Sequence, residues 1–170
     1  MGSILQDKQY NVLILCTGNS ARSILGEVLF NALGKGKFIA HSAGSKPVGR
    51  VNPFALELLQ QQGFGTKGLR SKSWDEFATP GAPEFDFIIT VCDNAAGETC
   101  PIWPGKPATA HWGIPDPAGV QGNSAAKLAA FRKASEQLAR RIQLFISLPI
   151  ESLDKLTLKE KLAEIGRIRD

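Results

Sequence analysis

The fold of this chain is decided by one stretch near its start, Val12-Leu13-Ile14-Leu15-Cys16-Thr17-Gly18-Asn19-Ser20-Ala21-Arg22-Ser23. Its first four residues are aliphatic, which predicts a buried strand. Small and polar residues follow, and apolar residues then recur at helical spacing as far as Gly34. The stretch therefore predicts a strand that passes through a short loop into a helix.

The loop carries a thiol and a guanidinium, at Cys16 and Arg22, separated by five residues. Backbone N–H groups of such a loop, together with the N-terminus of the next helix, form a cradle for an anion. Arg22 can close over a tetrahedral oxyanion with two hydrogen bonds. The same positive field favours a thiolate, which would make Cys16 a nucleophile. The alternative is a buried structural cysteine beside a surface arginine.

Strand and helix patterns alternate along the rest of the chain. Strands are expected at 11–15, 38–41, 85–91 and 109–112. Helices are expected from Ser20 to about Gly34, from Pro53 (capped by Asn52) to Gly63, from a Ser124 cap through Phe145, and from Thr157. This alternation predicts an α/β fold with a mostly parallel sheet covered on both faces. We expect one domain over 1–170, with a core at about 11–149 and a helical extension at 151–170.

Three further residues carry chemistry. Asp116 lies in the turn after the fourth strand, where it either forms the turn or overhangs the loop as a general acid. Cys92 follows the third strand, so it approaches Cys16 if the first and third strands are neighbours, whose spacing is ~5 Å. Cys92 and Cys100 are either unrelated thiols or a disulfide-forming pair. A continuous helix would hold their Cα atoms ~12 Å apart, beyond the ~7 Å that a disulfide tolerates, so pairing requires that the segment unwinds.

Composition narrows the possible functions. The net charge of +4 includes no block of Lys or Arg, so we expect no nucleic-acid partner. No apolar run reaches the ~20 residues of a membrane span, and the start lacks the apolar core of a signal peptide. Three cysteines and two distant histidines predict neither a disulfide scaffold nor a zinc site. We expect a monomer in the reducing cytoplasm.

Taken together, the motifs resemble the arsenate reductases built on the low-molecular-weight protein tyrosine phosphatase fold. They are, in order, Cys16-Thr17-Gly18-Asn19-Ser20 with Arg22-Ser23, His41-Ser42-Ala43-Gly44, Cys92 to Cys100-Pro101, and His111-Trp112-Gly113 with Asp116-Pro117-Ala118-Gly119. The resemblance covers about residues 11–149. It implies a three-layer α/β/α fold around a four-stranded parallel sheet, and the conversion of arsenate to arsenite.

The resemblance also implies roles for single residues. Cys16 would attack arsenate held by Arg22 and by the loop, which comprises Thr17, Gly18, Asn19, Ser20, Ala21, Arg22 and Ser23. Ser23 would stabilise the thiolate, Asn19 would hold the shape of the loop, and Asp116 would be the general acid. Cys92 would then attack the arseno adduct and form a disulfide with Cys16. Cys100 would move that disulfide to Cys92–Cys100 for an external reductant.

Some positions depart from the family pattern. Ala21 stands where many members have cysteine, which excludes a disulfide within the loop. The gap between Cys92 and Cys100 is one residue longer than in thioredoxin-coupled members, so the reductant is thioredoxin or the glutaredoxin/glutathione system. Some members bind potassium near the loop. Asn19, Glu27 and Ser42 match that site, but Ser73 stands at its acidic position, which leaves the ion open.

Two other functions remain open at this stage. A low-molecular-weight tyrosine phosphatase needs Cys16, Arg22 and Asp116 but has no use for Cys92 or Cys100. Phosphatases of this fold carry aromatic residues after the Asp-Pro pair, where Ala118-Gly119 stand here. An oxyanion-binding or redox-sensing module without turnover is the third possibility. The expected ligand is arsenate, with phosphate or sulfate as analogues and no bound cofactor.

Overall fold

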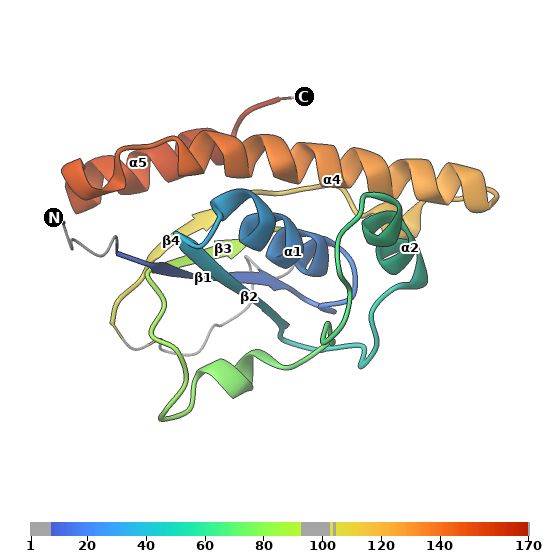
Figure 1. The fold of residues 1–170 in the computed structure, drawn as a ribbon, viewed down its shortest axis with the longest axis horizontal. Coiled ribbons are helices and arrows are strands. Elements are labelled where there is room, and N and C mark those ends of the chain that lie inside the picture. Colours follow the sequence, from blue (N-terminus) through green and yellow to red (C-terminus); the bar gives the residue numbers. More distant parts are fainter. Residues whose placement is uncertain (1–7, 93–102, 104, 170) are drawn as a thin grey trace, which may run out of the picture.

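The computed structural model describes residues 8–92, 103 and 105–169, and shows an α/β fold around a four-stranded parallel sheet (Figure 1). The strands are β1 (Tyr10–Cys16), β2 (Phe38–Gly44), β3 (Phe87–Thr90) and β4 (Ala108–His111), and their order is β2-β1-β3-β4. β1 pairs with both β2 and β3, with Leu15 opposite Thr90. The expected adjacency of the first and third strands is confirmed.

Helices connect and cover these strands. They are α1 (Arg22–Gly34), α2 (Pro53–Gln61), α4 (Ser124–Ile146) and α5 (Lys155–Gly166). Short 3-10 helices lie at η1 (Trp74–Phe77), η2 (Pro117–Gly119) and η3 (Ile150–Ser152). α1 packs on β1, β2 and α4, and α5 packs on β4. In Figure 1 α1, α4 and α5 lie on one side of the sheet and η1 lies on the other.

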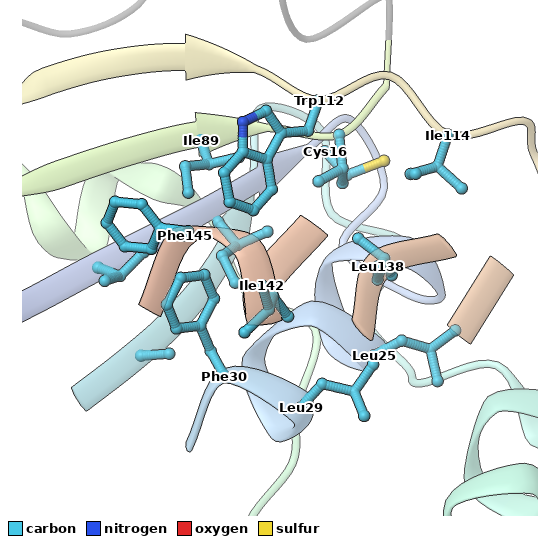
Figure 2. Packing of buried hydrophobic residues seen from close by; sticks show 14 of the residues in the cluster. Cys16, Leu25, Leu29, Phe30, Ile89, Trp112, Ile114, Leu138, Ile142 and Phe145 are labelled. Atoms are coloured by element: carbon cyan, nitrogen blue, oxygen red, sulfur yellow. The ribbon is translucent and has the colours of Figure 1, made fainter. Parts of the chain in front are cut away.

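Alternate residues of β1 enter two apolar clusters, because successive side chains of a strand point to opposite faces. Val12 and Ile14 join the cluster under the helices, and Leu13 and Leu15 join a second cluster with Trp74. Figure 2 shows the first cluster, where α4 supplies Leu138, Ile142 and Phe145 against Trp112 and α1. The sheet is thus the middle layer, and both of its faces are buried.

α1 begins at Arg22 rather than at the expected Ser20, and the starts of two further helices also differ from the expected ones. The cap of α4 is Asn123, whose side chain accepts a hydrogen bond from Ala126 N at 2.9 Å, rather than Ser124. The last helix begins at Lys155, because Asp154 caps it by accepting from Thr157 N at 2.7 Å. In both cases the Asn or Asp directly before the helix accepts a hydrogen bond from a free N–H group of the first turn, and this fixes where the helix begins.

The last helix covers the end of β4. The indole of Trp112, which is almost fully buried, donates a hydrogen bond to the Leu162 carbonyl at 3.0 Å. Gly166 lies so close to the His111 carbonyl that a Cβ there would collide with it. The segment after 150 therefore completes the core beside β4. Among the described residues, no helix is both long and apolar enough to cross a membrane.

Candidate active site

The loop predicted to bind an oxyanion lies at the carboxyl end of the sheet. Cys16 is the last residue of β1 and Arg22 the first of α1, so the five residues between them form the strand–helix turn. Gly44 is paired with Cys16, and a Cβ on it would collide with the Thr17 carbonyl. Only glycine lets β2 run this close to the loop, which is why the strand ends in Ala43-Gly44.

Hydrogen bonds from a neighbouring segment set the orientation of the loop's peptide units. Thr17 O accepts from Lys46 N, Gly18 O from Val48 N, and Ser20 O from Asn52 N, at 2.8–3.0 Å. The C=O and N–H of one trans peptide unit point in opposite directions. The N–H groups of the residues that follow these carbonyls therefore point away from segment 46–52; they belong to Gly18, Asn19 and Ala21. A loop with N–H groups aligned in this way is suited to an anion.

Asn19 is the central residue of the loop's support. It is fully buried, and its φ of 47° is in the left-handed region that Asn tolerates better than most residues. Its Nδ2 donates to Ser23 Oγ at 2.7 Å and to Ser42 Oγ at 3.0 Å, while its Oδ1 accepts from Lys72 N at 2.9 Å. Through these hydrogen bonds Asn19 connects the loop to α1, to β2 and to the segment at Lys72, in keeping with its expected role of holding the loop's shape. Ser23, also fully buried, is tied to the same amide.

Arg22 and Asp116 meet above the loop. Arg22 Nη1 donates to the Ile114 carbonyl at 2.9 Å, and Nη2 lies 3.9 Å from Asp116 Oδ1. The Asp116 side chain is 52% exposed and also accepts from Ala118 N at 2.9 Å, which caps η2. Asp116 therefore forms the turn and reaches the arginine as well. Because a guanidinium has five N–H donors, these two contacts leave others for an oxyanion.

Cys92 is the second thiol at the loop. Its Sγ accepts a hydrogen bond from Thr17 N at 3.3 Å and lies 3.6 Å from Thr17 Oγ1. Cys16 and Cys92 are both buried, and both belong to the cluster that Figure 2 shows around Trp112. The neighbouring strands β1 and β3 bring them together, as expected. Cys100 lies outside the described residues, so its pairing stays a prediction.

The expectation that the loop favours a Cys16 thiolate is wrong for this arrangement. The pKa of Cys16 is raised, first by its hydrogen bond with Cys92 and then by burial. The positive charge of Arg22 and the Thr17 backbone N–H lower that pKa, but they do not compensate. Sequence reasoning placed the arginine correctly and missed the effect of a second sulfur on the first.

Removing Cys92 should therefore lower the pKa of Cys16. We expect that the pH midpoint for alkylation of Cys16 by iodoacetamide moves to lower pH in a Cys92→Ala/Cys100→Ala variant. The matched control is Cys100→Ala alone, which keeps the contact between the first two sulfurs. Peptide mapping by mass spectrometry assigns the alkylated residue. Identical midpoints in the two variants would show that Cys92 does not set the ionisation of Cys16.

Sequence reasoning missed two residues that support the loop. Ser71 Oγ donates to the Gly18 carbonyl at 3.0 Å, and Lys72 is buried beside Glu27. Both lie in a segment without a helix or strand pattern, and a Ser-Lys pair there has no signature in the sequence. The isolated bridge between Gly44 and Ser73 and the hydrogen bond from Gly44 N to the Lys72 carbonyl join this segment to the end of β2 and bring both residues to the loop.

Comparisons with known proteins agree with this geometry. The family model described as "Low molecular weight phosphotyrosine protein phosphatase" matches residues 11–159. A curated protein named arsenate reductase, from Halalkalibacterium halodurans, is 32% identical over 134 residues, which are 79% of this chain and 93% of that protein.

Two solved structures support the same relationship. The arsenate reductase from Archaeoglobus fulgidus is 29% identical with a TM-score of 0.63, covering 81% of this chain and 99% of that one. A structure titled "An arsenate reductase in the phosphate binding state" is 26% identical with a TM-score of 0.67, covering 82% and 98%.

Proposed function

The chain belongs to the low molecular weight phosphotyrosine protein phosphatase family, and we propose that within this family it is an arsenate reductase. The single observation that carries the proposal is the position of Cys92, whose Sγ is 3.3 Å from Thr17 N at the loop that begins with Cys16. A phosphatase needs one thiol, whereas reduction of arsenate needs a second. Relatives named arsenate reductases, one of them in a phosphate-binding state, support the same assignment.

The first step is substitution at arsenic. Arsenate binds to N–H groups of the loop between Gly18 and Ser23 and to Arg22, and the Cys16 sulfur attacks arsenic as a thiolate. One As–O bond breaks, and Asp116 supplies the proton with which that oxygen leaves as water. Arsenic remains As(V) in the resulting Cys16 adduct. Phosphate and sulfate, which are also tetrahedral oxyanions, act as analogues that occupy the same loop.

The raised pKa of Cys16 shapes this step. In the arrangement described above, the thiol form of Cys16 is favoured by its contact with Cys92 and by burial. When the oxyanion binds to Arg22 and the loop, one of its oxygens accepts the Cys16 proton, so that the sulfur attacks arsenic as a thiolate.

The second step transfers two electrons. The Cys92 thiolate attacks the Cys16 sulfur and forms a Cys16–Cys92 disulfide, while the electron pair of the S–As bond goes to arsenic. As(V) becomes As(III) and leaves as arsenite, and the two sulfurs are oxidised together. The hydrogen bond from Thr17 N to Cys92 Sγ is suited to stabilising the attacking thiolate.

The last step returns the enzyme to its reduced state. We propose that Cys100 attacks Cys92 and releases Cys16, so that the disulfide passes to Cys92–Cys100. An external dithiol then reduces this pair by thiol–disulfide exchange, and either thioredoxin or the glutaredoxin/glutathione system can supply it. These reductants belong to the cytoplasm, and the cycle requires no bound cofactor.

A coupled assay tests the proposal. Purified protein is mixed with arsenate, NADPH and one complete reductant system, either thioredoxin with its reductase or glutaredoxin with glutathione and glutathione reductase. We expect NADPH oxidation that depends on arsenate and on one of the two systems. Hydrolysis of a small aryl phosphate without any arsenate-dependent NADPH oxidation would instead identify a tyrosine phosphatase, the alternative that uses only Cys16, Arg22 and Asp116.

The general-acid role of Asp116 has its own test. Asp116→Asn keeps an oxygen that can cap Ala118 N but cannot donate a proton, so the turn should persist. We expect the single-turnover rate to fall by about 10²–10⁴-fold, the usual range for a lost general acid, with little change in phosphate affinity. Asp75→Asn, at an exposed position in η1, is the matched control. An unchanged rate would leave Asp116 with its turn-forming role alone.

A further inference from the structure

Lys72 is a buried lysine with an acidic partner. Only 8% of its side chain is exposed, its Nζ lies 3.7 Å from Glu27 Oε1, and the same ammonium donates to the Arg70 carbonyl at 3.2 Å. Burial lowers the pKa of Lys72, and the charge of Glu27 opposes that shift. Lysine is almost never this buried without a partner, so the pair requires an explanation.

The pair is linked to the oxyanion loop by consecutive hydrogen bonds. Ser42 Oγ donates to Glu27 Oε1 at 2.6 Å, and Asn19 Nδ2 donates to Ser42 Oγ at 3.0 Å and to Ser23 Oγ at 2.7 Å. The backbone N–H of Lys72 also donates to Asn19 Oδ1 at 2.9 Å. Lys72 thus contacts both ends of this network, Glu27 through its ammonium and Asn19 through its main chain.

These residues do not fit a potassium ion as well. The Glu27 Oε1 atom is shared by the Ser42 hydroxyl and the Lys72 ammonium, and Asn19 Oδ1 is taken by a backbone N–H. The Asn19 amide group turned toward Ser42 is its NH₂, which repels a cation. The expectation of an ion held by Asn19, Glu27 and Ser42 therefore disagrees with the arrangement found here, and no step of the reaction is derived from it.

We propose that the Lys72 ammonium takes the place of a monovalent cation and is a positioning residue for the oxyanion loop. Its charge balances Glu27, which orients Ser42 and through it the Asn19 amide that holds the loop. A tethered ammonium is present at any salt composition, so the loop keeps its shape without a bound metal ion. The inference concerns the support of the loop, and it holds whichever oxyanion the protein turns over.

The experiment compares cations in wild-type protein and in Lys72→Ser. Melting temperature and the affinity for inorganic phosphate are measured in potassium, sodium and N-methylglucamine chloride at equal ionic strength. Wild-type protein should give the same values in all three. Lys72→Ser, which vacates the space beside Glu27, should melt lower by on the order of 10 °C and lose phosphate affinity in N-methylglucamine. Potassium or sodium should restore part of both in that variant only.

Controls separate this effect from general charge loss. Lys67→Ala removes an exposed lysine of the same connecting segment and should behave as wild type in every salt. Selective stabilisation of the wild type by potassium would overturn the proposal, because a separate ion would then be bound. So would a Lys72→Ser variant that equals wild type in N-methylglucamine.

A second variant decides the matter if Lys72→Ser does not fold. Glu27→Gln/Lys72→Met removes both charges together and leaves no buried carboxylate without a partner. We expect this double variant to fold and to melt higher than Lys72→Ser, with melting independent of the cation. A double variant no more stable than Lys72→Ser would show that the network does not need a balancing charge, and would overturn the proposal.

Discussion

Cys16→Ser is expected to abolish arsenate reduction and any hydrolysis of a small aryl phosphate. The Cys16 sulfur is the attacking atom in both reactions, and a serine hydroxyl in the same buried place is a far poorer nucleophile with no adjacent base among the contacts described above. We expect a loss on the order of 10⁴-fold or more, as for other nucleophiles removed from an assembled site. Steady-state and single-turnover assays measure it.

Phosphate binding is the control that shows whether the loop of the Cys16→Ser variant is intact. The loop contacts made by Thr17, Gly18, Asn19 and Ser20 do not involve the Cys16 side chain, so Cys16→Ser should still bind phosphate with an affinity within a few-fold of wild type. Calorimetry with inorganic phosphate and a thermal melt establish that the loop is intact. A variant that keeps more than a few per cent of the wild-type rate would show that another group is the nucleophile.

The second large effect, that of Cys92→Ser, distinguishes arsenate reduction from phosphate ester hydrolysis at the same loop. Cys92→Ser should stop multiple-turnover reduction of arsenate, because no second sulfur can accept the bond from Cys16. Hydrolysis of an aryl phosphate should persist, since phosphoryl transfer ends with water. At neutral pH it should not be slower than in wild type, because the contact that raises the pKa of Cys16 is lost. Parallel assays of the two activities in one preparation provide the measurement.

A trapping experiment accompanies this prediction. After arsenate is added without reductant, Cys100→Ser should hold a Cys16–Cys92 disulfide and the wild type a Cys92–Cys100 disulfide, both identifiable by peptide mapping. If both activities fell together in Cys92→Ser, Cys92 would have a structural role only. In a parallel sample with glutathione added, finding only mixed disulfides of Cys16 with glutathione would replace the three-cysteine relay by a cycle with one thiol.

Much of the fold was predictable because local and global patterns agree. The aliphatic run before Cys16 predicted a strand, the Asn52-Pro53 pair predicted a helix start, and both are confirmed. Strand alternation predicted the parallel sheet, and the β1–β3 adjacency brings Cys92 to the loop. The boundaries at Asn123 and Asp154 were missed because several capping side chains stand in line and only geometry selects among them.

The energetics of the site were less predictable. A charge such as Arg22 is visible in the sequence, but its effect on Cys16 competes with burial and with a second sulfur 76 positions away in the chain. Lys72 reads as an ordinary surface lysine until the segment around Ser73 is placed beside Gly44. In both cases the decisive term depends on a contact between distant segments, which spacing within one motif does not encode.

The pairing of β1 with β3 has a consequence for how this enzyme class can diversify. The backbone ladder that ends at Leu15 and Thr90 brings the first two thiols together, so their contact depends on strand pairing. In the proposed relay, the choice of electron donor depends on Cys100 and on the sequence between it and Cys92, so changes there would alter the donor while the step between Cys16 and Cys92 stays the same. In the proposed relay, the residues that bind the oxyanion and the residues that select the electron donor can therefore change independently in evolution.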